Sequence, residues 1–225
     1  MKYRSVAIDG PSGAGKSTLA RQLAEELGFL YVDTGAIYRT AALKAYRSGV
    51  NPADGEGVTS LLNDLEIGMA YGENGEQKMY LGAEDVSEEI RLHAISSMAS
   101  QISAIPEVRA CLLHVQRKLA RQQDVVMDGR DIATVVLPDA DVKIFLTARP
   151  ETRAKRRLNE LLLRGQQADF DTVLRDIISR DNQDRGRAVS PLRQAEDAVL
   201  LDTTDMNLND SAQALLSIVK EGLNL

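Results

Sequence analysis

The sequence predicts an α/β fold in which a parallel five-stranded sheet is flanked by helices and carries an antiparallel insertion. Two observations lead to this fold class. Short apolar runs alternate with longer stretches of helical spacing over most of the 225 residues, and this alternation is typical of a parallel sheet covered on both faces. One stretch in the middle of the chain, rich in glycine and polar residues, breaks the alternation.

The expected strands are apolar runs at residues 6–8, 29–32, 125–127, 142–146 and 198–201. The first expected helix has Leu19, Leu23 and Leu27 at four-residue steps, and Gly28 supplies its end. Pro106 should begin a later helix, because proline favours the first helical turn. The apolar faces of this helix and of the last helix are formed by Val108, Leu112, Val115 and Leu119, and by Ala212, Leu215, Leu216, Val219 and Leu223.

The irregular stretch runs from about residue 66 to residue 86. Two short runs, 67–71 and 78–81, lie on either side of Asn74-Gly75, a pair that favours a tight hairpin turn. We therefore expect a small antiparallel insertion in an otherwise parallel fold.

The composition limits the class of protein. A net charge of −6 argues against a general affinity for nucleic acid, because binding to its backbone needs a basic surface. Arginine accounts for 19 of the 27 basic residues, and its planar guanidinium suits phosphate and carboxylate ligands. The sequence shows neither a signal peptide nor a long apolar run, so we expect a cytoplasmic protein without a membrane segment.

The strongest motif follows the first expected strand. Residues 10–17 match the pattern of Gly, any four residues, Gly, Lys, and Ser or Thr, and a periodic helix comes next. Glycine lets backbone N–H groups converge on a phosphate, Lys16 would reach the β- and γ-phosphates, and the Ser17 hydroxyl would bind Mg²⁺. The motif predicts a nucleoside triphosphate site formed by Gly10, Pro11, Ser12, Gly13, Ala14, Gly15, Lys16, Ser17 and Thr18.

Polar residues also follow the second and third expected strands. Ligands of open parallel sheets bind at the carboxyl ends of the strands, so Asp33, Thr34, Tyr38 and Arg39 are candidates for a second substrate site. Capping of the next helix by Asp33 or Thr34 is compatible with that role. The segment 128–131, Asp-Gly-Arg-Asp, follows the third expected strand. Its first residue, Asp128, is a candidate Mg²⁺ partner, and Arg130 and Asp131 would reach over the site.

Arginines gather in two later segments. Arg149, Arg153, Arg156 and Arg157 share one face of an expected helix, which is either a solvated charged face or a lid that brings arginines onto a transferring phosphate. In a protein with a phosphate loop we favour the lid. The segment 180–191 holds three arginines and two acids, and Arg180, Asp184 and Arg187 would share a face if that helix continues.

Four motifs together identify a family. Gly-Pro-Ser-Gly-Ala-Gly-Lys at 10–16, Gly-Ala-Ile-Tyr-Arg at 35–39, Asp-Gly-Arg-Asp at 128–131 and Arg-Ala-Val-Ser-Pro-Leu at 187–192 resemble the bacterial cytidylate kinases, a family of P-loop nucleoside monophosphate kinases. The resemblance spans nearly the whole chain. It implies a single P-loop kinase domain over 1–225, with an inserted monophosphate-binding subdomain at 60–103 and a helical lid at 149–166. The implied reaction is transfer of the ATP γ-phosphate to CMP or dCMP.

The same resemblance implies roles for particular residues. The cytosine ring would meet Ser100, Arg109, Asp131 and Asp184; the substrate phosphate would meet Tyr38, Arg39 and Arg130; and the pentose would meet Asp184, Arg180 and Arg187. Thr34 joins the substrate site where the family often has serine, and Ser17 stands where glycine is also common; both keep a hydroxyl. Lys16, Arg130, Arg153 and Arg157 are the expected catalytic residues.

These residue types fit the implied chemistry. A phosphate monoester is already ionised at neutral pH and needs no general base, so the task is to position two anions and stabilise the transferring group. We expect Mg²⁺ to act with ATP, held by Ser17, and we leave open whether Asp33 or Asp128 assists. We also expect a monomer that acts on ATP and CMP or dCMP and binds neither nucleic acid nor membranes.

Other functions compete with this one. The nearest alternative is another P-loop kinase of a small molecule such as UMP, AMP or shikimate, but the paired acids and the insertion favour cytosine. A GTP-binding switch would need a guanine-reading Asn-Lys-x-Asp motif, which the chain lacks, and the match of 54–57 to a switch motif lies away from any strand end. A nucleic-acid-linked ATPase is opposed by the acidic net charge.

Overall fold

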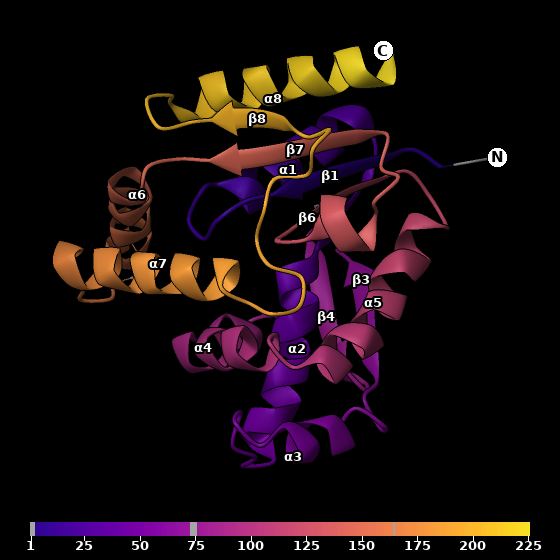
Figure 1. The fold of residues 1–225 in the computed structure, drawn as a ribbon, viewed down its shortest axis with the longest axis vertical. Helices are drawn as coiled ribbons and strands as arrows, with labels where there is room; N and C mark the ends of the chain where they lie inside the picture. Colours follow the sequence, from indigo (N-terminus) through magenta and orange to yellow (C-terminus); the bar gives the residue numbers. More distant parts are fainter. Residues whose placement is uncertain (1–2, 73–75, 164) are drawn as a thin grey trace. The chain divides into compact units, whose positions relative to one another are not determined.

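The computed structural model describes residues 3–72, 76–163 and 165–225 (Figure 1). Contacts within the chain divide it into two compact units. The first comprises the chain up to Tyr31 together with Gln123–Leu225, and the second comprises Val32–Gln122.

The first unit is built around a parallel sheet with strand order β2-β6-β1-β7-β8. β1 pairs in parallel with β6 and β7, and β7 pairs in parallel with β8. All five strands lie where apolar runs predicted them, so the parallel five-stranded sheet is confirmed. The elements are β1 Ser5–Asp9, α1 Lys16–Leu27, β2 Leu30–Asp33, β6 Val125–Gly129, the π-helix η2 Ile132–Val136, β7 Val142–Thr147, α6 Pro150–Leu163, α7 Phe170–Arg185, β8 Val199–Asp202 and α8 Leu208–Leu223.

Helices α1 and α8 cover one face of this sheet. Leu19 and Leu23 of α1 and Leu215 and Val219 of α8 join the strand residues in one buried apolar cluster. Figure 1 shows α8, in yellow, running alongside β8. Gly28 ends α1 as predicted, with a φ of 67° that favours glycine.

Two further helices, α6 and α7, pack on each other and form a small core of Ala154, Val173 and Ile177. Helix α7 ends at Arg185, so Arg187 lies outside it. The possible continuation of this helix through Arg187 is therefore wrong, because Gly186, a poor helix former, occupies its C-cap.

The second unit contains an antiparallel sheet with strand order β3-β4-β5 beside helices. The predicted antiparallel insertion is confirmed: Ile67 pairs with Leu81 and Tyr71 with Gln77. The predicted turn at Asn74-Gly75 lies outside the described residues, and the two-residue strand β5 was not predicted. The elements are α2 Thr34–Arg47, α3 Gly55–Ser60, β3 Ile67–Tyr71, β4 Gln77–Leu81, β5 Glu84–Asp85, the 3₁₀ turn η1 Glu89–Arg91, α4 His93–Ile102 and α5 Pro106–Ala120.

Two local features of this unit match their sequence signals. Pro106 begins α5, which buries Val108 and Leu112 as expected. Asp54, the first residue of the chance match to a switch motif, instead caps the short helix α3 by accepting a bond from the Gly57 N–H. Among the residues that the structure describes, no helix has the length and apolar character needed to cross a lipid bilayer.

Candidate functional site

The loop between β1 and α1 has the shape that its glycines were expected to allow. A Cβ placed on Gly10 would lie 1.9 Å from the backbone oxygen of Leu146, so any side chain there would collide with β7. Gly15, at the N-cap of α1, has a φ of 92°. No side chain caps this helix, so its N-terminal N–H groups and its positive dipole end are available to an anion.

Lys16 is the first residue of α1 and is buried, with 5% of its surface exposed. Its Nζ donates a hydrogen bond of 2.8 Å to the backbone oxygen of Pro11, within the loop. Burial lowers the pKa of Lys16 to about 7 and the positive charge of Arg130 adds to this, although Asp128 and Asp184 act in the opposite direction. An anionic ligand would restore the ordinary charged state of this lysine.

Ser17 lies next to the end of β6. Its Oγ donates a hydrogen bond of 3.0 Å to Asp128 Oδ2, and Tyr31 Oη donates one of the same length to Asp128 Oδ1. Asp128 is 4% exposed, whereas Ser17 is open to solvent. The arrangement therefore presents one hydroxyl oxygen and one carboxylate at the mouth of the phosphate loop.

This oxygen pair fits the way in which proteins bind Mg²⁺ with nucleotides. Such sites use one or two oxygen ligands, with water and phosphate oxygens completing the coordination. The described residues contain no group of three or more His, Cys, Asp and Glu side chains that could form a complete metal site. The donors suit a nucleotide-bound Mg²⁺ rather than a metal held by protein alone.

Asp184, near the end of α7, lies between two arginines of the same unit. Arg130 Nε donates to its Oδ2 at 2.8 Å, and Arg187 Nη2 donates to its Oδ1. Burial raises the pKa of Asp184, but the charges of Arg130, Arg187 and Arg180 and the bond from Arg130 together lower it below its ordinary value. The structure thus joins three predicted substrate residues in one ion cluster, with the carboxylate ionised at neutral pH.

The four arginines after β7 bind different partners. Arg149 pairs with Asp205 at the surface, and Arg157 pairs with Glu160 while 40% of its side chain stays exposed. Arg156 donates to the backbone oxygen of Thr203 at 2.7 Å. Helix α6 begins at Pro150, so the expected place of Arg149 on this face is wrong, while Arg153, Arg156 and Arg157 keep the spacing of one helix face and bind different partners. Arg164, the last arginine of this segment, lies outside the described residues.

Arg153 is the most buried of these arginines, at 2% exposure. Two of its nitrogens bind Asp181 of α7 at 3.0 and 2.5 Å, and it also donates to the backbone oxygens of Ala148 and Ser12. These bonds link α6 and α7 to the phosphate loop. A catalytic role for Arg153 stays a prediction beside this structural one.

In the second unit, Asp33 organises the start of α2. Its Oδ1 accepts a hydrogen bond from the Ala36 N–H at 2.9 Å, which makes it the N-cap, and its Oδ2 accepts one from Arg39 at the same distance. Among the described residues, the buried Nε of Arg39 has no hydrogen-bond partner. Capping by Asp33 is confirmed, and Arg39 Nε is a donor that an anion could use.

The side chain of Gln77 on β4 holds the backbone of Asp33. Its Oε1 accepts from the Asp33 N–H at 2.8 Å, and its Nε2 donates to the Asp33 oxygen at 3.3 Å. The amide thus takes the place of a neighbouring strand at the end of β2. This contact ties the antiparallel insertion to the residue that orients Arg39.

The other predicted residues of the second unit lie on three helices. Thr34 is buried at the start of α2, and Tyr38 lies on the same helix. Arg109 of α5 is 7% exposed; its guanidinium carbon is 5.5 Å from the centre of the Tyr38 ring, and its Nη1 donates to the Ser103 oxygen at 3.0 Å. Ser100 lies half-buried on α4, at the turn closed by a bond from Ser103 Oγ to its backbone oxygen.

Three residues of the candidate site were missed by sequence reasoning: Asp9, Tyr31 and Gln77. Asp9 carries the signal that indicated Asp128, an acid at the end of an apolar strand, but it stands just outside the loop motif that begins at Gly10. Tyr31 and Gln77 carry no such signal, because their partners are 97 and 44 positions away in the sequence.

Comparison with known proteins finds similar chains over nearly the whole length of this one. The family model described as cytidylate kinase matches residues 6–221. A cytidylate kinase of Syntrophotalea carbinolica is 48% identical over 216 residues, covering 96% of this chain and 92% of that protein. A cytidylate kinase of Carboxydothermus hydrogenoformans is 46% identical over 214 residues, covering 95% and 96%. The crystal structure of an uncharacterized protein from Eubacterium ventriosum matches with a TM-score of 0.52 at 14% identity over 98% of this chain and 99% of that one, a likeness of fold alone.

Proposed function

The chain belongs to the cytidylate kinase family, and from this we propose that it transfers the γ-phosphate of ATP to CMP or dCMP, giving ADP and CDP or dCDP. The observation that carries the proposal is the ion cluster of the first unit. A buried, ionised Asp184 held by Arg130 and Arg187 supplies a carboxylate acceptor and positive charge for an acceptor nucleotide, on the same unit as the phosphate loop.

The ATP site is assigned to the loop 10–18. Its backbone N–H groups and the uncapped N-terminus of α1 support binding of the β- and γ-phosphates. Lys16, with its lowered pKa, takes up a proton when these phosphates arrive and then neutralises charge on the transferring group. The buried lysine is already in place, so no side chain has to be reorganised at the moment of transfer.

Mg²⁺ is the proposed cofactor. Ser17 and Asp128 would hold it, Ser17 directly and Asp128 directly or through water, and we favour Asp128 over Asp33 because Asp33 is already bound to Arg39 and the α2 N-terminus. When bound with ATP, the ion neutralises phosphate charge and orients the γ-phosphate.

The acceptor nucleotide is assigned to the residues that the family resemblance marks. Tyr38, Arg39 and Arg130 would bind the CMP phosphate; Ser100, Arg109, Asp131 and Asp184 the cytosine; and Asp184, Arg180 and Arg187 the pentose, with Thr34 beside them. Asp184 and Asp131 accept hydrogen bonds, which suits the N4 amino group of cytosine and opposes the O4 acceptor of uracil. The Nε of Arg39, which has no hydrogen-bond partner among the described residues, supports its role at the phosphate.

The arginines of α6 are proposed to act at the transferring phosphate. Arg157 is half-exposed and pairs with nearby Glu160, so it can readily be redirected to a phosphate. Arg153 contributes through its bonds to the phosphate loop and Asp181. Exclusion of water by α6 and its neighbours would protect ATP from hydrolysis.

One experiment tests the proposed function. The purified protein is given ATP and Mg²⁺ with CMP, dCMP, UMP, AMP or shikimate, and ADP formation is followed. We expect turnover with CMP and dCMP at least tenfold above that with the other acceptors, since a carboxylate aimed at an amino group penalises uracil strongly. Preference for any other acceptor would contradict the proposal.

We further propose a monomeric cytoplasmic protein that binds neither nucleic acid nor membranes. Sedimentation analysis tests whether the protein is a monomer.

A further inference from the structure

Asp9 is a buried carboxylate that the proposed mechanism does not use. It is the last residue of β1, directly before the phosphate loop, and only 1% of its surface is exposed. Its Oδ1 accepts a hydrogen bond from the Ile132 N–H and its Oδ2 accepts one from the Ala133 N–H, both at 2.8 Å. One side chain thus binds two successive backbone donors more than 120 positions away.

Ile132 and Ala133 are the first two residues of the π-helix η2. Asp131 is the N-cap residue of this helix, but its side chain makes no capping hydrogen bond. The first N–H groups of a helix have no partner within it and need an acceptor from elsewhere. Asp9 supplies that acceptor from another strand. Single-turn π-helices are frequent at functional sites, and this one begins directly after the two residues assigned to the acceptor nucleotide.

The backbone of Asp9 adds a second connection to the same segment. In the β1–β6 ladder Asp9 lies opposite Gly129, the residue before Arg130. The span Arg130-Asp131 is therefore held at its start by the sheet and at its end by the Asp9 carboxylate. A single residue of β1 fixes both ends of this two-residue span.

The carboxylate is costly at this place. Burial raises the pKa of Asp9 to about 7, against the lowering effect of its two hydrogen bonds. An Asn or Ser could cap one donor without burying a charge, but a carboxylate offers two acceptor oxygens and can satisfy both donors at once. A carboxyl group kept at this buried place, where its two oxygens serve two backbone donors beside a substrate segment, points to a functional constraint.

We propose that Asp9 is a positioning residue for phosphoryl transfer, which sets the place of Arg130 and Asp131 through the Ile132 and Ala133 N–H groups. The inference rests on the proposed function, because Arg130 and Asp131 touch substrate only if the acceptor is a cytidine monophosphate. Asp9 itself touches no substrate in this proposal.

The test uses Asp9→Asn, which keeps the shape of the side chain but places an amide N–H₂ against a backbone N–H. We expect kcat/KM for CMP to fall about 10- to 100-fold, the effect of a small misplacement of catalytic groups, while KM for ATP changes by less than about twofold. A variant with unchanged kcat/KM for CMP would overturn the inference. So would a variant that loses ATP and CMP affinity equally, since that would indicate disruption of the phosphate loop.

A cycle with the double variant Arg130→Ala/Asp131→Asn separates positioning from a general structural role. If Asp9 acts by placing Arg130 and Asp131, adding Asp9→Asn to that double variant should lower kcat/KM by less than about threefold. Full multiplication of the Asp9→Asn effect and the effect of the double variant would overturn the inference. Failure of the proposed function has a different signature, because the unsubstituted protein would then not phosphorylate CMP.

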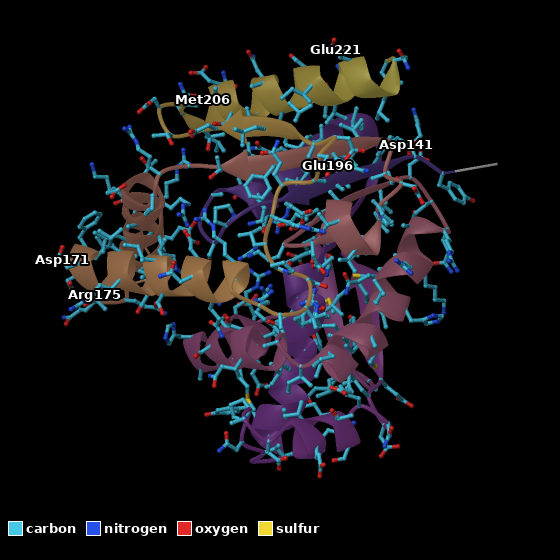
Figure 2. The ribbon with its side chains drawn as sticks, viewed as in Figure 1. Asp141, Asp171, Arg175, Glu196, Met206 and Glu221 are labelled. Atoms are coloured by element: carbon cyan, nitrogen blue, oxygen red, sulfur yellow. The ribbon has the colours of Figure 1, made fainter. Side chains whose placement is uncertain are left out.

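Asp141→Asn is the matched control. Asp141, labelled in Figure 2, lies just before β7, and its Oδ2 accepts bonds from the Ser5 N–H and hydroxyl at 2.9 and 3.2 Å. Asp141 therefore holds the start of β1, whereas Asp9 lies at its end. The start of β1 is at the opposite end of the strand from the phosphate loop. We expect Asp141→Asn to lower the melting temperature and leave kcat/KM unchanged; an equal loss of kcat/KM in both variants would overturn the inference. If Asp9→Asn does not fold, Asp9→Glu, which shifts the carboxylate by one methylene, is held to the same expectation.

Discussion

The hydroxyl of Ser17 donates a 3.0 Å hydrogen bond to the carboxylate of Asp128, which joins the start of α1 to the end of β6. The two residues are 111 positions apart, and both belong to the first unit. Asp128 also accepts a bond from Tyr31, so the carboxylate is held from two sides. This pair is the basis of the proposed Mg²⁺ site and of the first prediction.

Asp128→Asn should weaken the use of Mg²⁺. The substitution removes a negative charge while keeping the size of the side chain, so we expect the Mg²⁺ concentration for half-maximal turnover to rise at least tenfold, about 1.4 kcal/mol in binding. Turnover is measured against Mg²⁺ at fixed ATP. Tyr31→Phe is the control, because it removes a hydrogen bond to the same carboxylate but leaves the charge. Equal shifts in both variants would show that Asp128 has only a structural role.

Lys16→Ala should lower kcat about 10²- to 10³-fold, the usual loss when one electrostatic contact to the transition state is removed. The fold should persist, because the lysine is buried with a lowered pKa and its removal relieves a desolvation cost. Steady-state kinetics and thermal unfolding of the same sample check both parts. Near-normal turnover in a stable variant would remove Lys16 from the catalytic residues.

The pKa of Lys16 also predicts proton uptake on ATP binding. With a pKa of about 7 in the free protein, the lysine is mostly neutral at pH 8, and the phosphates should raise that pKa and draw in a proton. Calorimetry in buffers of different ionisation enthalpy measures this proton at pH 8, and Lys16→Ala should abolish it. The same pKa predicts how stability depends on pH. Between about pH 7 and 10.5 the unfolded chain binds a proton on Lys16 that the folded chain does not, so the contribution of Lys16 to the free energy of unfolding rises with pH over that window. A lysine in a salt bridge, whose pKa is raised on folding, would show the opposite dependence.

Two arginines of α6 should differ in how far their loss destabilises the protein. Arg157→Ala should lower kcat by similar factors with CMP and dCMP and leave the melting temperature within about 2 °C, because the side chain is half-exposed. Arg153→Ala should destabilise the protein by about 3–5 kcal/mol, since it leaves the buried Asp181 without its partner. A change only in the ratio of CMP to UMP use by Arg157→Ala would show that the lid interpretation is wrong.

Base choice should depend on Asp131. Asp131→Asn turns a pure hydrogen-bond acceptor into a group that also donates. We therefore expect kcat/KM for CMP to fall more than about tenfold, and the ratio of kcat/KM for CMP to that for UMP to decrease. Both acceptors are measured on the same variant. If Asp131 served only to orient its neighbours, the two would lose activity by one factor, and an unchanged ratio would remove Asp131 from the base-reading residues.

Local sequence patterns were enough for the elements of the fold. The five strands, the glycine at the end of α1 and the proline at the start of α5 depend on interactions within a few residues, where periodicity and backbone preference dominate. The antiparallel pairing of β3 with β4 followed for the same reason. The phosphate loop could be predicted equally well from the sequence, because the residues of its motif are eight consecutive positions.

The sequence by itself therefore determined the fold class, the phosphate loop and the family. Only the tertiary structure decided which polar groups hold that loop and its neighbours: Asp9 bound to Ile132, Gln77 to Asp33, and Arg153 to Asp181. It also showed that Arg149, Arg153 and Arg157, which spacing alone had placed on one face, pair with three different acids. The physical reason is that a charged or amide side chain has no preferred partner in its own segment; its energy is set by burial and by the donors and acceptors that distant strands and helices bring to it.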